Sequence, residues 1–188
     1  RYTDEAIGQF VEELKAEGLY DNTVIALYGD HHGLNSGMKD VNEDVSQFIG
    51  RTYDYDEMLN VPLIIHIPGS NISNTIQTSG GQIDFLPTIA NIMDIPYDSR
   101  FTLGQDITNA KEGFVAFTSY LFEGSFLKGD VMFEISREGI FEGSRAIRIK
   151  KGEEVDISQY EEDYNHALLL KKTSKEILEQ DILERHLD

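Results

Sequence analysis

The pattern of apolar and polar residues in the first part of the chain predicts a helix followed by a buried strand. Apolar residues recur at helical spacing between Ile7 and Leu14, which predicts a helix with Asp4 as its N-cap and Gly18 at its end. The apolar run Thr23–Leu27 is rich in β-branched residues and is bounded by turn residues. Such a run favours a buried strand.

A second apolar run, Val61–Ile67, predicts another buried strand, because Pro62 is tolerated at the first positions of a strand. Between the two strands lies a long polar connection with one short predicted helix, Val41–Ile49, and connections of this length are usually functional or mobile. A further helix is predicted with Asp84 as its N-cap and Pro87 in its first turn. Its apolar stripe consists of Leu86, Ile89, Ala90 and Met93.

The pattern changes in the last part of the chain, where short apolar segments are separated by turns that contain glycine. Phe114–Thr118, Val131–Ile135 and Ala146–Lys150 predict strands, and the last of these alternates as a half-exposed antiparallel strand does. Tyr160–Leu187 predicts one or two amphipathic helices. These elements predict an α/β fold, and a length of 188 residues predicts one domain or part of one.

Composition excludes several classes of protein. The net charge of −18 argues against nucleic-acid binding, which needs a basic surface, and disfavours electrostatic docking on an anionic membrane. The absence of cysteine excludes disulfides and cysteine-based zinc sites in this chain. No apolar run approaches the ~20 residues of a membrane span. Because the sequence starts at Arg1 and enters a predicted helix almost at once, we expect a fragment or processed product.

The candidate chemistry lies directly after the first predicted strand, in the segment Leu27-Tyr28-Gly29-Asp30-His31-His32-Gly33. Ligands in open α/β sheets bind at the carboxyl ends of strands. The oxygen of Asp30 and the nitrogen of His31 suit Mn²⁺ or Zn²⁺, with Mg²⁺ as a further alternative. In the simpler interpretation Asp30 caps a turn, because two ligands are not a complete metal site. His32 is either a substrate contact or an ordinary loop residue.

The other histidines have simpler explanations. His66 lies on the second predicted strand, which favours a hydrogen-bonded histidine in the core. His166 and His186 lie on a predicted surface helix, so we expect both to be exposed to solvent.

Four segments, in this order, resemble lipoteichoic acid synthases, which belong to the sulfatase branch of the alkaline phosphatase superfamily. These segments are Glu12–Ile25, Tyr28–Gly33, Val61–Gly69 and Gly81–Ile89. The resemblance covers about residues 2–107. It implies a central sheet flanked by helices, with residues 1–110 forming the C-terminal half of a sulfatase-like catalytic domain. It also implies that residues 111–188 form a small antiparallel sheet with a terminal helix.

The resemblance further implies a phosphoglycerol transferase at the extracellular face of the bacterial membrane, anchored by transmembrane segments absent from this chain. Such enzymes move glycerol phosphate from phosphatidylglycerol to a polyglycerol-phosphate chain in cell-wall synthesis, using a threonine nucleophile and Mn²⁺ or a similar ion. The metal pair of the family falls on Asp30 and His31. The position of His32 is often aromatic in the family. The nucleophile and the remaining metal ligands of the family lie upstream of this chain, so we expect this chain alone to be inactive.

Two other functions stay open at this level. A sulfatase or phosphodiesterase of the same superfamily would carry a different nucleophile, whereas a threonine favours the transferase. A non-catalytic surface module would use its acidic face or its C-terminal sheet to bind a partner.

Overall fold

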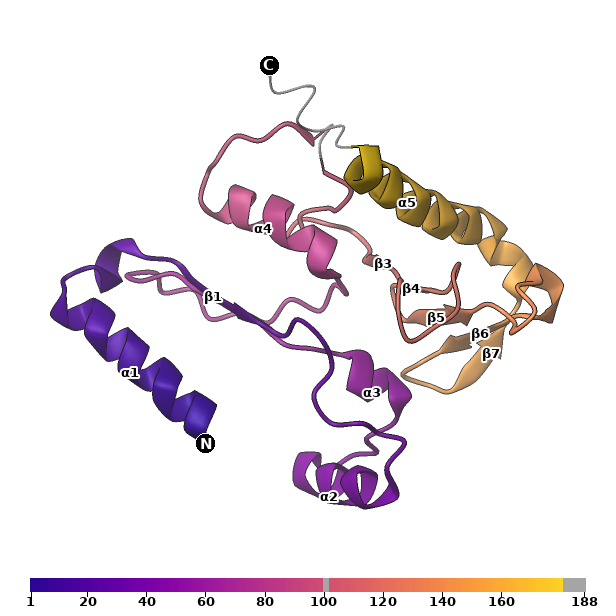
Figure 1. Ribbon diagram of the computed structural model, residues 1–188, viewed down its shortest axis with the longest axis horizontal. Coiled ribbons are helices and arrows are strands. Elements are labelled where there is room, and N and C mark those ends of the chain that lie inside the picture. The colour runs from indigo at the N-terminus through magenta and orange to yellow at the C-terminus, as the bar shows by residue number, and fades with distance from the viewer. Residues whose placement is uncertain (100–101, 181–188) are drawn as a thin grey trace. The chain divides into compact units, whose positions relative to one another are not determined.

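The computed structural model describes residues 1–99 and 102–180 (Figure 1). The chain divides into two compact units, the first at residues 1–74 and the second from residue 75 onward. This division reflects compactness, and the predicted domain boundary between residues 110 and 111 stays a prediction. No helix in the described part of the chain combines the length and the apolar character that crossing a bilayer requires.

The first unit consists of four helices and a two-stranded antiparallel sheet. Its elements are, in order, α1 (Tyr2–Ala16), η1 (Tyr20–Asn22), β1 (Ile25–Tyr28), α2 (Lys39–Ile49), α3 (Tyr55–Leu59) and β2 (Leu63–His66).

Helix α1 ends where the sequence predicts but begins earlier. Gly18 has φ +68°, and the Leu19 N–H donates to the Leu14 carbonyl at 2.9 Å, as in helix C-caps with a left-handed glycine. Asp4 as the N-cap is wrong, because the N-cap is Arg1 and Asp4 lies in the first turn. There its charge still favours the helix dipole.

Strands β1 and β2 form where they are predicted, but the prediction that they are buried is wrong. They pair in the register Ile25↔His66 to Tyr28↔Leu63. Tyr28 is 49% exposed and Ile64 is 59% exposed. In the described residues these strands pair only with each other, and a two-stranded ribbon cannot cover both of its faces.

The connection between β1 and β2 is more ordered than its composition indicates. Helix α2 confirms the short helix predicted there, and α3 is an addition. The N-cap of α3 is Asp54, whose carboxylate accepts from the Glu57 N–H at 3.0 Å. Tyr53 ties the segment together, because its hydroxyl donates to the Leu34 carbonyl at 2.7 Å. Met58 is buried at 4% exposure. The segment after β1 is therefore a folded lobe.

The second unit is built on a five-stranded antiparallel sheet in the order β3-β4-β5-β6-β7. The three predicted strands are found, and β4 and β7 are additions of three residues each. The elements are η2 (Gln82–Asp84), α4 (Phe85–Ile92), β3 (Phe114–Ala116), β4 (Phe126–Lys128), β5 (Val131–Glu134), η4 (Phe141–Gly143), β6 (Arg145–Arg148), β7 (Glu153–Val155), η5 (Ile157–Tyr160) and α5 (Glu161–Gln180).

An aromatic layer between the sheet and α5 forms the core of this unit. Phe126 and Phe133 are opposite each other on β4 and β5, are both fully buried, and stack with their ring centroids 4.9 Å apart. Ala167 and Tyr164 on α5 pack in this cluster, and Figure 1 shows α5 beside the strands of the sheet. The part of the predicted C-terminal helix beyond residue 180 lies outside the described residues.

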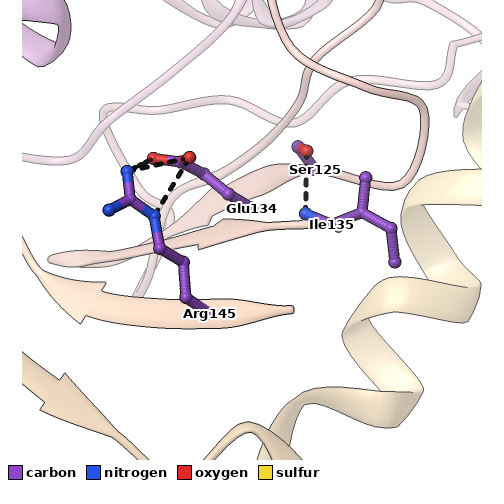
Figure 2. Close-up of polar contacts among 4 residues, drawn as sticks. All are labelled: Ser125, Glu134, Ile135 and Arg145. Carbon is purple, nitrogen blue, oxygen red and sulfur yellow. Dashed lines mark hydrogen bonds and ion pairs between the residues drawn. The ribbon is translucent and has the colours of Figure 1, made fainter. Parts of the chain in front are cut away.

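The end of β5 is fixed by two polar contacts, which Figure 2 shows. The Ile135 N–H donates to the Ser125 hydroxyl at 3.2 Å, and Ser125 is 1% exposed. Arg145 on β6 binds both carboxylate oxygens of Glu134, at 2.8 and 3.0 Å through one of its terminal nitrogens. These contacts hold the register at the end of the sheet.

Asp84 stands at the N-cap position of α4, as predicted, but its side chain binds elsewhere. Its two carboxylate oxygens accept from the N–H groups of Gly81 and Gln105, each at 2.8 Å. The residue is 2% exposed. The predicted stripe on α4 is only partly buried, since Ala90 is 3% exposed and Leu86 is 57% exposed.

Candidate metal centre

The candidate site directly follows the last residue pair of the β1–β2 sheet, Tyr28 and Leu63. The Gly29 N–H donates to the Pro62 carbonyl at 3.1 Å. A Cβ atom on Gly29 would lie 3.0 Å from the Cβ of Val61 and 3.3 Å from its Cγ1. Contacts this short are tighter than most real Cβ contacts, so a side chain in that position would need Val61 to shift by a few tenths of an ångström. A glycine therefore stands here because the neighbouring strand approaches closely.

Beyond Gly29 the chain turns back on itself and brings the side chains of Asp30 and His31 together. The carbonyl oxygen of His31 lies 3.5 Å from the point that a Gly29 Cβ would occupy. The Nε2 atom of His31 lies 3.6 Å from the Oδ1 atom of Asp30. The two side chains are 65% and 86% exposed, respectively. The pair is thus open to solvent and to a ligand.

The other ring nitrogen of His31 decides what this pair can bind. Its Nδ1 atom lies 2.6 Å from the backbone carbonyl oxygen of His32. A carbonyl oxygen only accepts hydrogen bonds, so Nδ1 must carry the proton in this contact. In the neutral ring Nε2 is then a bare acceptor. When the ring is neutral, Nε2 is therefore available as a ligand atom beside the Asp30 carboxylate.

A divalent cation fits this donor set. Two nitrogen or oxygen ligands bound tetrahedrally at about 2.1 Å lie roughly 3.4 Å apart, close to the 3.6 Å between Nε2 and Oδ1. One carboxylate oxygen and one imidazole nitrogen suit Mn²⁺, Zn²⁺ or Mg²⁺. Of these ions, Zn²⁺ accepts nitrogen ligands most readily, Mn²⁺ less readily and Mg²⁺ least. Within residues 1–99 and 102–180, no group of three or more His, Cys, Asp or Glu side chains could hold a metal. The roles of Asp30 and His31 as metal ligands stay predictions.

The remaining histidines lie apart from this pair or have other contacts. His32 is half-buried, with its ring 6.1 Å from that of His31, and its predicted role in substrate binding stays a prediction. His66 is opposite Ile25, at the far end of the ladder, where its Nε2 is hydrogen-bonded to the Tyr20 hydroxyl at 2.6 Å. It is exposed, so the expected core position is wrong although the ring has a partner.

The last two predicted surface histidines lie in the C-terminal part of the chain. His166 is exposed on α5, as expected, and its ring lies 4.9 Å from that of Phe114. His186 lies outside the described residues.

Val61 and Pro62 are the contributors to the site that the sequence does not reveal. Their residue types predict only the start of a strand, and their contact with Gly29 depends on the register of β1 with β2. The glycine before the acid is the one available signal, because a glycine at a strand end often marks close approach of another backbone.

Comparison with known proteins places the chain in a family. The model of the family described as Sulfatase matches residues 1–95. A lipoteichoic acid synthase-like protein of Bacillus subtilis, YvgJ, is 34% identical over 139 residues, which is 71% of this chain and 22% of that protein. Lipoteichoic acid synthase 1 of Bacillus subtilis is 39% identical over 110 residues, 57% of this chain and 17% of that protein. The chain thus spans about a fifth of the length of these curated relatives.

A solved structure has the same fold. The crystal structure of the lipoteichoic acid synthase LtaP from Listeria monocytogenes matches with a TM-score of 0.82 and 24% identity, covering 95% of this chain and 44% of that one. The α/β architecture with helices and antiparallel sheets is therefore that of an alkaline phosphatase/sulfatase-like fold. The family match and the curated relatives agree with this fold. The chain therefore belongs to the sulfatase family, in its lipoteichoic acid synthase group.

Proposed function

We propose that this chain supplies two metal ligands, Asp30 and His31, to a metal-dependent phosphoglycerol transferase. The reaction moves glycerol phosphate from a phosphatidylglycerol-like lipid to a polyglycerol-phosphate chain, at the extracellular face of a bacterial membrane to which the enzyme is anchored. The observation that carries the proposal is that Nε2 of His31 lies 3.6 Å from Oδ1 of Asp30, directly after β1, while Nδ1 of the same ring contacts the His32 carbonyl. The names of the curated relatives support the reaction class.

The residues of this chain have distinct tasks in that reaction. Asp30 contributes a negative charge that attracts the cation, and the His31 ring contributes a nitrogen ligand through Nε2. His32 lies next to the pair and is the candidate contact for the substrate. A Mn²⁺ ion, or Mg²⁺ or Zn²⁺ in its place, would stabilise charge on the phosphate and on the attacking oxygen. We assign that oxygen to a threonine outside this sequence.

A hydrolase of the same superfamily is the second candidate, because the matching family model is that of sulfatases. Both reactions would use the Asp30–His31 pair in the same way. They differ in the acceptor, which is water for the hydrolase and a glycerol hydroxyl for the transferase. Product analysis distinguishes them, since only the transferase lengthens a polyglycerol-phosphate chain.

Transfer from a fluorescent phosphatidylglycerol analogue by the whole enzyme that carries this chain tests the proposal. Asp30→Ala should lower the Mn²⁺-dependent rate by about 100-fold or more, because several kcal/mol of charge stabilisation is lost with the ion. Asp21→Ala is the matched control, since Asp21 is an exposed acid near the start of β1. Equal rates for the wild type and Asp30→Ala would refute the metal role.

Calorimetric titration of Mn²⁺ into the 188-residue chain separates a partial from a complete site. Weak binding that is lost in Asp30→Ala and kept in Asp21→Ala is the expected result, because two ligands hold an ion poorly. Tight binding abolished by Asp30→Ala would show that this chain completes the site by itself. The chain alone should show no transfer.

A further inference from the structure

The turn that carries Asp30 and His31 is held in place from two sides. His31 donates from Nδ1 to the His32 carbonyl at 2.6 Å, and Gly29 is packed against Val61. We propose that the His31 ring is preset as a ligand before any ion binds, with the His32 carbonyl fixing its tautomer and Val61 positioning the turn. The identity of the ligand that the ring binds rests on the proposed function. The tautomer of the His31 ring can be measured without assuming that function.

The first element that holds the His31 ring in place is the hydrogen bond inside the turn. A neutral imidazole exchanges its proton between two nitrogens, and only the nitrogen without the proton can bind a metal. The second nitrogen of a metal-binding histidine usually donates to a carbonyl or a carboxylate, which selects the tautomer. Here the acceptor is the main-chain oxygen of His32. The side chain of residue 32 is therefore not needed for this effect.

The second element is the packing of Val61 against Gly29. The Cβ and Cγ1 atoms of Val61 fill the space in which a side chain of Gly29 would stand, at 3.0 and 3.3 Å from that point. The His31 carbonyl borders the same space at 3.5 Å. Together with the hydrogen bond from the Gly29 N–H to the Pro62 carbonyl, this close approach ties the residue that begins the turn to the segment before β2. Val61 thus acts on His31 through Gly29.

Two strands set this arrangement through their register. Tyr28 is opposite Leu63, so the ladder delivers residues 29 and 61–62 to the same end of the ribbon. Ile65 pairs with Ala26 in the middle of the same ladder. A substitution at Ile65 should change the ladder but not the turn, which makes it the matched control for Val61.

Nitrogen-15 NMR of the metal-free 188-residue chain tests the ring state. The five histidines are assigned with single His→Gln variants, at a pH of about 8, where an ordinary imidazole is neutral. His31 should carry its proton on Nδ1 as the major form, and His32→Ala should leave this unchanged. A major form protonated on Nε2, or an equal mixture, would overturn the proposal.

The role of Val61 is tested by Val61→Ala, with Ile65→Ala as the control. Val61→Ala should shift His31 toward a mixture of tautomers. It should also lower the affinity of the chain for Zn²⁺ by about 10-fold, as measured from the Nε2 signal of His31. Ile65→Ala should change neither. Val61→Ile keeps both γ carbons and should restore the ring state. The same His31 spectrum in Val61→Ala as in the wild type would overturn the positioning role.

Titration with Zn²⁺ distinguishes failure of this inference from failure of the proposed function. A shift of the Nε2 signal of His31 supports both. A shift of Nδ1 instead would overturn the preset ring. An Nδ1-protonated ring that does not respond to Zn²⁺ at any concentration would support the ring assignment and overturn the proposed metal role.

Discussion

The two units of the chain use their apolar residues in opposite ways. The strands of the first unit are continuous apolar runs, yet Ile64 is 59% exposed and Leu27 is 37% exposed. In the second unit Phe126 and Phe133 are fully buried, although the strands there are no longer than β1 and β2 and are more mixed in composition. An apolar run therefore predicts that a strand forms, but the elements that pack on the strand decide its burial.

The difference follows from the number of layers in each unit. The second unit has five paired strands with α5 packed on the sheet through the aromatic layer. Among the described residues of the first unit, Met58 is the one buried hydrophobic residue. The second unit should accordingly have the more cooperative unfolding transition, and substitutions in its core should have the larger effects.

Phe133→Ala is expected to have the largest effect on stability. It removes a fully buried ring that stacks on Phe126 at 4.9 Å, and such a truncation costs about 3–5 kcal/mol of unfolding free energy. Ile64→Ala on the exposed β2 should cost about 1 kcal/mol or less. Urea unfolding followed by circular dichroism measures both. Equal losses would contradict the contrast between the units.

Asp84→Ala should have the next largest effect. It leaves the N–H groups of Gly81 and Gln105 without their carboxylate acceptor, and each unsatisfied buried donor costs about 1–3 kcal/mol. Asp21→Ala, at an exposed position of the first unit, should be nearly neutral. Thermal unfolding of the two variants compares them. A neutral Asp84→Ala would show that water replaces the carboxylate.

The pH dependence of stability should differ in sign between two acids of the second unit. Burial raises the pKa of Asp84 above its ordinary value of 3.8, against the opposing hydrogen bonds from Gln105 and Gly81. The folded state then binds this proton more tightly than the unfolded state. The contribution of Asp84 to the unfolding free energy is fully present below about pH 4 and is lost as the pH rises through its folded-state pKa.

Asp106 should behave in the opposite way. Burial tends to raise its pKa, but hydrogen bonds from Thr108 and Asn109 outweigh burial and lower the pKa below 3.8. Its contribution is therefore present above that value and is lost as the pH falls through the folded-state pKa. Unfolding curves from about pH 2 to pH 7 for Asp84→Asn and Asp106→Asn, each against the wild type, measure the two signs. The same sign for both would contradict the assignment.

Regular local patterns made most of the fold predictable. The helical spacing before Gly18 and the apolar runs at β1 and β2 locate these elements because each signal is contained in a single segment. The strands β4 and β7 are missed since three residues are too few to show alternation. Asp4 is misjudged because the helix begins at the start of the chain without a side-chain cap.

The candidate site divides in the same way. Asp30 and His31 are adjacent in the sequence, so their proximity is predictable from it. The contact of Gly29 with Val61 joins residues that only the ladder brings together, and no local pattern contains it. The tautomer of His31 likewise depends on the backbone direction at His32, which residue types alone do not determine.

The smallest predicted effect concerns the attachment of α5 to the sheet. Lys128 on β4 binds both carboxylate oxygens of Asp163 at 2.8 and 2.9 Å, and this hydrogen-bonded pair raises the pKa of Lys128 above 10.5. The side chains are 32% and 17% exposed, so Lys128→Met should lower the unfolding free energy by only about 1 kcal/mol. The double variant Lys128→Met/Asp163→Asn should cost little more than Lys128→Met, because the two groups act as a pair. If the two single losses simply add, the pair contributes nothing, and the aromatic layer alone holds α5 on the sheet.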